Sequence, residues 1–194
     1  MTIEYEATFA NIDKDEIKDR LKSVGAKLIK PEFLQKRENF SPHNDGKGWI
    51  RVRDEGDKIT MSYKRLVSRD NIDGQKEICL EIDDYDEAKS FLETLGFKQK
   101  NFQESKREIW ELDGVEICID EWPFLEPFVE VEGKNEIEVK NICEKLGFDY
   151  SQAKFCATGN LYEEKYNVPS GVVNNHTPKI IFDMENPFLN YGKK

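Results

Sequence analysis

Six short segments of the chain alternate between apolar and polar residues with a period of two, the pattern of a β-strand with one buried face. Near the start of the chain, Ile3 and Tyr5 oppose Glu4 and Glu6. The same alternation recurs in residues 49–53, 59–64, 77–82, 115–120 and 129–133. The strand around Arg107 alternates poorly, so its faces are not assigned. The pattern predicts a protein built largely of antiparallel strands.

Three other segments carry an apolar stripe at helical spacing. Residues 15–25 (DEIKDRLKSVG) and 86–96 (DEAKSFLETLG) resemble each other at an offset of 71, and each ends in a glycine suited to the position after a helix. Asp13 and Asp84 precede them as expected N-caps. A looser third copy covers residues 136–147.

The strands that follow the first two helices also resemble each other. Arg37 and Arg107 lie at an offset of 70 within them. Chance is the alternative, because helix–glycine–strand units are common. We favour a duplicated unit with halves at about 1–85 and 86–166, closing over one another because neither half buries its own sheet comfortably.

The polar faces of the strands hold carboxylates, Arg and Lys rather than the Thr, Gln and Asn of an ordinary exposed face. Each strand alone also fits an antiparallel sheet whose charged face meets water. Three amphipathic helices are available to cover the apolar faces, which would place the charges inside. We therefore predict an α+β fold: a closed eight-stranded antiparallel β-barrel, or tunnel, with helices packed outside.

The inward set combines two kinds of charge. Its acids are Glu4, Glu6, Glu77, Glu81, Glu116, Asp120, Glu130 and Glu132, and its bases are Arg37, Arg51, Arg53, Lys64 and Arg107. Arg forks bind phosphate oxygens bidentately, while clustered carboxylates suit Mg²⁺ or Mn²⁺. The charges therefore predict a site for a polyphosphate and a metal.

The composition narrows the alternatives. Lys and Arg total 29 against 39 Asp and Glu, a net charge of −10, which argues against general nucleic-acid binding. No apolar run is long enough to span a membrane, and the acidic first residues do not resemble a signal peptide, so we expect a cytoplasmic protein. The four cysteines are not spaced as a zinc site. Gly-rich phosphate loops are absent, and His43 and His176 fall in expected loops.

The order of these motifs resembles the CYTH-domain proteins of the triphosphate tunnel metalloenzyme superfamily. The resemblance runs from Ile3 to about Tyr166. It rests on Glu4-x-Glu6, Trp49-x-Arg51-x-Arg53, Tyr63-Lys64, Glu77-x-x-x-Glu81, Lys106-Arg107, Asp120 and the run FVEVEG at 128–133. The stretch FLQKR at 33–37 is most similar to the class IV adenylyl cyclase branch.

The resemblance implies an enzyme that acts on a small-molecule triphosphate (ATP, thiamine triphosphate or tripolyphosphate) with Mg²⁺ or Mn²⁺. Hydrolysis by water and cyclisation by a ribose hydroxyl both remain open, and a homodimer would be unsurprising. Carried onto this sequence, it assigns Arg37, Arg51, Arg53, Lys64 and Arg107 to the triphosphate, Glu4, Glu6, Glu81, Asp120, Glu130 and Glu132 to the metal, and Glu4, Glu6, Lys64 and Arg107 to catalysis.

One position departs from the family pattern. The signature is E-x-E-x-K, and its third position here is Thr8. Lys30, Lys36 or Lys64 are candidates to replace the missing cation. The alternative function is a non-catalytic module that binds polyphosphate or nucleotide, and a plain β-barrel interaction protein is a third. Residues 167–194 form an extension in which the run 179–182 suits an edge strand, unless the extension binds a partner or is mobile.

Overall fold

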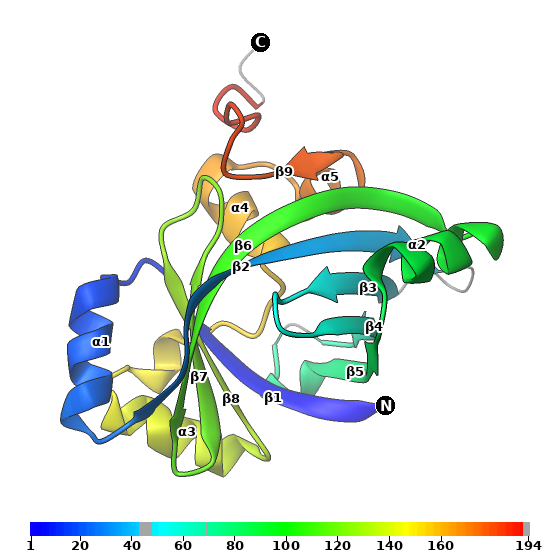
Figure 1. Cartoon of the computed structure of the whole chain (residues 1–194). Helices are drawn as coiled ribbons and strands as arrows, with labels where there is room; N and C mark the ends of the chain where they lie inside the picture. The colour runs from blue at the N-terminus through cyan, green and yellow to red at the C-terminus, as the bar shows by residue number, and fades with distance from the viewer. Residues whose placement is uncertain (43–47, 69, 192–194) are drawn as a thin grey trace.

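The computed structural model describes residues 1–42, 48–68 and 70–191 (Figure 1). Within these ranges the chain forms eight long strands, one short strand and five α-helices. The strands are β1 (Thr2–Phe9), β2 (Lys27–Ser41), β3 (Gly48–Asp54), β4 (Ile59–Leu66), β5 (Gln75–Ile82), β6 (Lys98–Leu112), β7 (Val115–Glu121), β8 (Phe128–Gly133) and β9 (Lys179–Ile180). The helices are α1 (Lys14–Ser23), α2 (Tyr85–Thr94), α3 (Glu136–Lys145), α4 (Gly159–Tyr166) and α5 (Ser170–Asn175). His43 lies outside the described residues.

The eight long strands close into an antiparallel barrel. The strand order is β2-β3-β4-β5-β1-β8-β7-β6, and β6 pairs back onto β2 to complete the circle. Every neighbouring pair in this circle is antiparallel. The predicted α+β barrel with external helices is confirmed. None of the helices in the described ranges is both long and apolar enough to cross a membrane.

The same order of elements occurs twice along the chain. The first unit is β1, α1, β2, β3, β4 and the second is β5, α2, β6, β7, β8. The strands β2 and β6 are both 15 residues long, and each follows its helix at the same distance. By element order the second unit begins at Gln75, ahead of the division after residue 85 expected from the sequence. The first strand of each unit pairs with a strand of the other unit, so the two halves interlock.

The ends of the first two helices follow the sequence signals. Asp13 accepts hydrogen bonds from the backbone N–H groups of Asp15 and Glu16, and Asp84 accepts one from Glu87. After each helix, Gly25 or Gly96 has a positive φ, 81° and 83°, in the region that favours glycine. The expected N-caps and terminal glycines are therefore in place.

The helices cover the barrel unequally. Both α1 and α3 pack on the outer faces of β1, β7 and β8, where Ile17, Leu21, Val139 and Ile142 join the largest apolar cluster. Helix α2 covers the opposite side, through Leu92 against Phe40 and Val52. Figure 1 shows α1 and α2 on opposite sides of the barrel. On the outer face of β5, Ile82 joins the cluster under α2, but Ile78 and Leu80 are about half exposed.

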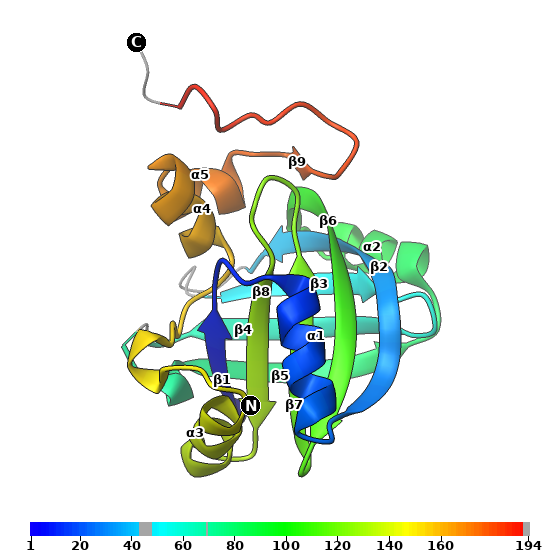
Figure 2. The same ribbon diagram turned by 90° about the vertical axis from the view of Figure 1, so that its left-hand side faces the viewer.

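The C-terminal extension packs on one end of the barrel (Figure 2). Strand β9 pairs in parallel with β6, opposite Phe102 and Gln103. Val168, Val173, Ile180 and Phe188 of the extension form a second apolar cluster, together with side chains of α4 and with Trp122 and Phe128 of the barrel. The run 179–182 thus provides a strand at its first two residues, and the extension is folded onto the domain.

Candidate functional site

A polar cavity of about 170 Å³ lies inside the barrel. Its charged lining comes from all eight barrel strands. The bases are Arg37, Arg51, Arg53, Lys64 and Arg107, and the acids are Glu4, Glu6, Glu77, Glu116, Glu130 and Glu132. The strands alternate as the sequence predicts, so the apolar positions between these residues face the helices or the outside. The barrel therefore brings nearly all of the predicted inward charges together.

The two signs of charge are separated in space. Four of the five bases lie on β2, β3 and β4, and we call the β2–β5 side of the tunnel the cationic wall. Five of the six acids lie on β1, β7 and β8, and we call the β1, β6–β8 side the acidic wall. Each wall contains one charge of the opposite sign, Glu77 on the cationic wall and Arg107 on the acidic wall.

Each of these minority charges pairs with two neighbours of its own wall. Glu77 lies 3.2 Å from Arg51 Nη2 and 3.9 Å from Lys64 Nζ. Arg107 donates two hydrogen bonds to Asp120, of 2.8 and 2.7 Å, and one of 2.6 Å to Glu130. Each wall is therefore partly neutralised from within, and Arg53 is likewise paired with Glu55 at 2.6 Å.

Arg37 is different from the other cations. It is only 6% exposed, and its described partners are neutral: Nη2 donates to Gln35 and Ser105, and the guanidinium lies 4.5 Å from the centre of the Trp122 ring. Burial and the nearby charges of Arg51 and Arg53 lower its pKa well below the ordinary value. A buried cation without a carboxylate partner is costly, so this position favours an anionic ligand.

The guanidinium groups of the cationic wall have spare hydrogen-bond donors. The Nε atoms of Arg37, Arg51 and Arg53 are buried and make no hydrogen bond to any described residue. Unsatisfied buried donors are uncommon in folded proteins and indicate a missing partner. Phosphate oxygens are suitable acceptors for such donors.

On the acidic wall, three carboxylates lie in a row across neighbouring strands. Glu132 of β8 is directly opposite Glu6 of β1 on one side and Glu116 of β7 on the other. Like charges in opposed positions destabilise a sheet. Burial, opposed by Lys64 and reinforced by neighbouring acids, raises the pKa of both Glu6 and Glu132. Glu132 makes no hydrogen bond or ion pair to any described side chain, so no cation contacts the centre of the row directly within the described residues.

The seam between the two walls holds two carboxylates, Glu4 and Glu77, whose pKa values are shifted in opposite directions. Burial and a hydrogen bond to Glu77 raise the pKa of Glu4. Burial opposes ionisation of Glu77 as well, but the hydrogen bond from Glu4, with Lys64 and Arg51, lowers its pKa. Lys64 Nζ lies 3.0 Å from Glu4 Oε2, the one ion pair of this cavity that joins the two walls among the described residues.

The acidic wall fits a divalent cation in its chemistry. Carboxylate oxygens are the ligands that Mg²⁺ and Mn²⁺ prefer, and the buried Oε2 of Glu4 has no well-oriented hydrogen bond to a described group. Across the part of the chain that the structure describes, no three His, Cys, Asp or Glu side chains converge as a ready-made metal site. Mg²⁺ does not need one, because it usually takes one or two carboxylates, several waters and substrate phosphate oxygens.

Two predicted metal ligands are not part of this lining. Glu81 has the inward orientation on β5, but β1 pairs with β5 only as far as Glu77, so Glu81 is paired on one side only, with Thr60 of β4, and its side chain is exposed. Asp120 points inward but is fully buried, with both oxygens bonded to Arg107. Burial, despite the nearby charge of Arg107, raises the pKa of Asp120 to about 6. Asp120 therefore orients Arg107 in this structure.

Thr8 has the inward position predicted for the missing lysine. Its backbone pairs with that of Lys154, whose segment covers this end of β1, and Thr8 is 2% exposed. Of the three proposed substitutes, Lys36 is exposed outside the barrel and Lys30 binds Asp57 and the carbonyl of Glu55. Only Lys64 lines the cavity.

Several lining residues have no role in the sequence prediction. Trp49, Trp122 and Thr158 contribute to the polar cavity, and Gln75 donates to Glu6 at 3.2 Å. Trp49 had the inward position in its strand, so its alternation with Arg51 was the available signal. Trp122 and Thr158 lie outside the alternating strands, and no pattern in the sequence pointed to them. His176 ends α5 at an exposed position, away from the cavity.

The fold and the site together define the class of protein: a closed antiparallel barrel with a charged tunnel inside and helices outside. Comparison with known proteins places it further: the CYTH domain model matches residues 2–157, and the chain belongs to that family. A protein from Methanocaldococcus jannaschii named putative adenylate cyclase is 27% identical over 136 residues, which cover 67% of this chain and 76% of that protein.

Solved structures share the fold at low sequence identity. A putative adenylate cyclase from Vibrio parahaemolyticus superposes with a TM-score of 0.70 at 11% identity, covering 82% of this chain and 97% of that one. A putative adenylyl cyclase from Hippeastrum, described as revealing a dominant triphosphatase activity, gives a TM-score of 0.57 at 14% identity, covering 87% and 99%. These structural similarities confirm the fold, and the match to the domain model confirms the predicted CYTH family.

Proposed function

We propose that the tunnel binds the phosphate chain of a small-molecule triphosphate together with Mg²⁺ or Mn²⁺ and catalyses attack on one of its phosphorus atoms. The observation that carries the proposal is the uncompensated buried charge of Arg37, beside two further arginines with unsatisfied Nε donors. A polyanion is the ligand that satisfies all three groups at once.

The acidic wall suits the cation that such a polyanion brings. Glu4, Glu6, Glu130 and Glu132 are the carboxylates best placed to hold it, since all four line the cavity. A bound divalent cation would neutralise phosphate charge and join the substrate to this wall. Asp120 would contribute through Arg107, and Glu81 would contribute only if it moved inward from its exposed position.

Phosphoryl chemistry needs mainly position and charge from the protein. Arg51, Arg53 and Lys64 would hold the phosphate chain along the cationic wall, and Arg107 would reach it from the other side. Glu4 and Glu6 are the candidates to orient the attacking hydroxyl and accept its proton, because both have raised pKa values caused first by burial. A water nucleophile gives hydrolysis, and the ribose 3′-hydroxyl of ATP gives cyclisation.

One observation favours a second candidate, a tunnel that binds polyphosphate or nucleotide without catalysis. Thr8 replaces the signature lysine, and the backbone of Lys154 covers it. The loss of a cation at this point of β1 removes charge next to the acidic wall. By analogy with the loss of one oxyanion-hole donor, such a change lowers transition-state stabilisation by about 3 kcal/mol.

The deciding experiment is product analysis by ³¹P NMR with ATP, thiamine triphosphate and tripolyphosphate, each with Mg²⁺ or Mn²⁺. Release of orthophosphate supports a triphosphatase, and pyrophosphate with a cyclic nucleotide supports a cyclase. Shifted resonances of bound phosphates without turnover support the binding module. The absence of both turnover and binding in all samples would contradict the proposal.

A further inference from the structure

A second cavity adjoins the polar tunnel at the end covered by the C-terminal extension. Its volume is about 130 Å³, roughly ten times the space that one buried water needs. The two cavities share six lining residues: Arg37, Trp49, Arg51, Trp122, Ala157 and Thr158. A ligand that touches Arg37 and Arg51 with its phosphates can therefore extend into this second space.

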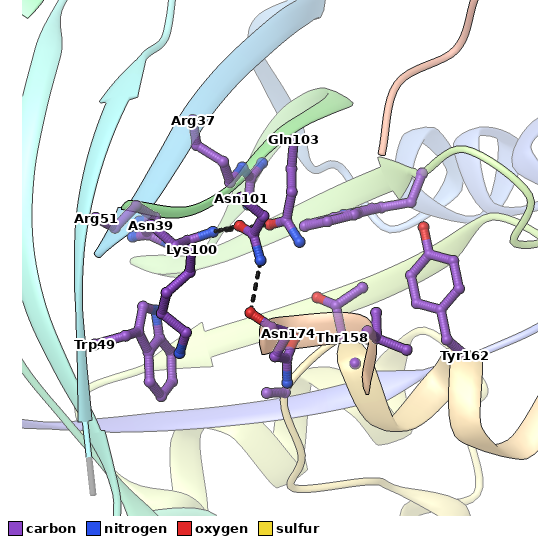
Figure 3. A pocket seen from close by; sticks show the side chains of 14 residues that line it. Arg37, Asn39, Trp49, Arg51, Lys100, Asn101, Gln103, Thr158, Tyr162 and Asn174 are labelled. Atoms are coloured by element: carbon purple, nitrogen blue, oxygen red, sulfur yellow. Dashed lines mark hydrogen bonds between the residues drawn. The ribbon is translucent and has the colours of Figure 1, made fainter. Parts of the chain in front are cut away.

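The lining of the second cavity differs sharply from that of the tunnel. No Asp or Glu is among its described lining residues, and four carboxamides take their place: Asn39, Asn101, Gln103 and Asn174. Trp49 and Tyr162 lie at its two ends, with the carboxamides between them (Figure 3). We call this space the amide pocket. Apart from Lys100 and the two arginines that it shares with the tunnel, its lining is uncharged, and its ends are aromatic, which suits an uncharged polar group better than a phosphate.

Hydrogen bonds fix the carboxamides and leave some of their capacity unused. Asn39 Nδ2 donates to Asn101 Oδ1 at 2.7 Å and to Gln103 Oε1 at 3.0 Å. Asn101 Nδ2 donates in turn to the backbone oxygen of Asn174 at 2.7 Å, as the dashed lines in Figure 3 show. The Nε2 group of Gln103 and the Oδ1 atom of Asn39 have no partner among the described residues. A donor and an acceptor thus remain available beside each other.

Asn174, which forms one side of the amide pocket, lies beyond the residues that match the CYTH domain model, which end at 157. Strand β9 holds this segment on β6, where Phe102 N–H donates to Pro178 O at 2.9 Å. Gly159 leaves room for the Asn174 side chain, because a Cβ at position 159 would lie 2.7 Å from Asn174 Nδ2. The amide pocket is therefore a feature of this chain and its extension.

We propose that the amide pocket binds a planar nitrogen heterocycle carried by the triphosphate, so that the protein selects organic triphosphates over inorganic tripolyphosphate. Paired carboxamide donors and acceptors match the edge of such a ring, as Asn and Gln do with adenine in nucleic acids. Aromatic side chains provide stacking surfaces. Lys100, whose pKa burial lowers, adds a donor near Trp49. The proposal rests on the tunnel binding the phosphate chain.

The test measures affinity by calorimetry on the full chain with Mg²⁺, using tripolyphosphate, the four common nucleoside triphosphates and thiamine triphosphate. We expect at least one organic triphosphate to bind ten or more times as tightly as tripolyphosphate. Gln103→Met keeps the side-chain length but removes its hydrogen-bonding groups. It should reduce the affinity for the organic triphosphate about tenfold without changing the affinity for tripolyphosphate. Gln99→Met, at an exposed position of the same strand, is the matched control.

Gly159→Ala gives an independent variant, because the added methyl group displaces the Asn174 side chain without removing any barrel residue. It should also reduce the preference for the organic ligand. If tripolyphosphate binds but no organic triphosphate exceeds it, the amide pocket proposal is wrong and the tunnel proposal survives. If tripolyphosphate and all the organic ligands fail to bind, the tunnel proposal itself fails. Equal losses for organic and inorganic ligands in Gln103→Met would also overturn the inference.

Discussion

The two walls of the tunnel have the same arrangement of strands but carry opposite charges. The cationic wall presents Arg37, Arg51, Arg53 and Lys64, whereas the acidic wall presents five glutamates. Both walls have four strands, taken as three from one repeat and the first strand of the other. The difference therefore arises from the inward side chains alone. The backbone repeat supplies the enclosure, and the side chains supply the chemistry.

The outer surfaces of the two repeats remain alike where their interiors differ. Lys18 of α1 binds Glu108 of β6 at 2.8 Å, and Lys89 of α2 binds Glu38 of β2 at 2.7 Å. Each helix thus pairs with the long strand of the other repeat, at positions 71 and 70 residues apart. Because these two helix-to-strand ion pairs are equivalent, the same barrel backbone can carry two facing walls of opposite charge. This separation of charge suits a ligand that is itself composed of an anion and a cation.

The largest effect should follow from breaking the acidic wall. Glu132→Gln removes the central carboxylate of the row, and we expect metal-dependent turnover to fall about 10³-fold. Binding of tripolyphosphate without metal should stay equal or improve, because a repulsive charge is gone. Glu81→Gln is the matched control and should change neither quantity, since Glu81 is exposed away from the cavity. Loss of metal-free binding in Glu132→Gln would contradict the assignment of the two walls.

Breaking the cationic wall should have a smaller effect that does not depend on the metal. Arg37→Gln removes the cation that lacks a carboxylate partner, and we expect the affinity for tripolyphosphate to fall about 30-fold with or without Mg²⁺. Lys36→Gln, the neighbouring exposed position on β2, should leave the affinity unchanged. Circular dichroism and a thermal melt would check that both variants keep the fold. An unchanged affinity in Arg37→Gln would count against both tunnel functions.

Much of the barrel could be predicted because its strands alternate regularly between charged and apolar residues. The inward positions of Glu4, Arg51 and Lys64 follow from that alternation alone. The long strands β2 and β6 were harder, since their pairing shifts register near Lys30 and between Asn39 and Phe40. These shifts explain why the faces around Arg107 could not be assigned. They also explain why the carboxamides of the amide pocket were missed, since they lie on the same two strands.

Two other features depend on contacts far apart in the sequence. Glu81 obeys the alternation of β5, yet whether it lines the tunnel depends on where β1 begins to pair. The extension was left open because residues 167–194 have no clear periodicity. Its structure comes from Val168, Val173 and Phe188 packing against the barrel and α4. Patterns within a segment predict its faces, but not which faces another segment covers.

Adding a cation to the acidic wall would sharpen the comparison. Thr8→Lys restores a charge to β1 at an inward position, directly opposite Glu130 of β8. We expect tripolyphosphate affinity to rise about tenfold, and turnover to rise with it. Because the backbone of Lys154 pairs with that of Thr8, a thermal melt of Thr8→Lys tests whether the new side chain fits beneath this segment. Thr8→Val, which is similar in shape and uncharged, is the control. A fall in affinity on Thr8→Lys would mean that the native tunnel has no space for the signature lysine.

The smallest predicted effect concerns the two ion pairs that join helices to the long strands. Lys18→Met and Lys89→Met each remove one helix-to-strand ion pair, but the carboxylates left behind differ. Glu108 keeps a 2.7 Å hydrogen bond from Trp110, whereas the buried Oε2 of Glu38 already lacks a hydrogen bond to a described group. Because an unsatisfied buried carboxylate destabilises a fold, Lys89→Met should lower the free energy of unfolding by about 1 kcal/mol more than Lys18→Met. Urea denaturation at neutral pH measures the difference. Equal losses of the free energy of unfolding would show that the two ion pairs contribute equally despite their different surroundings.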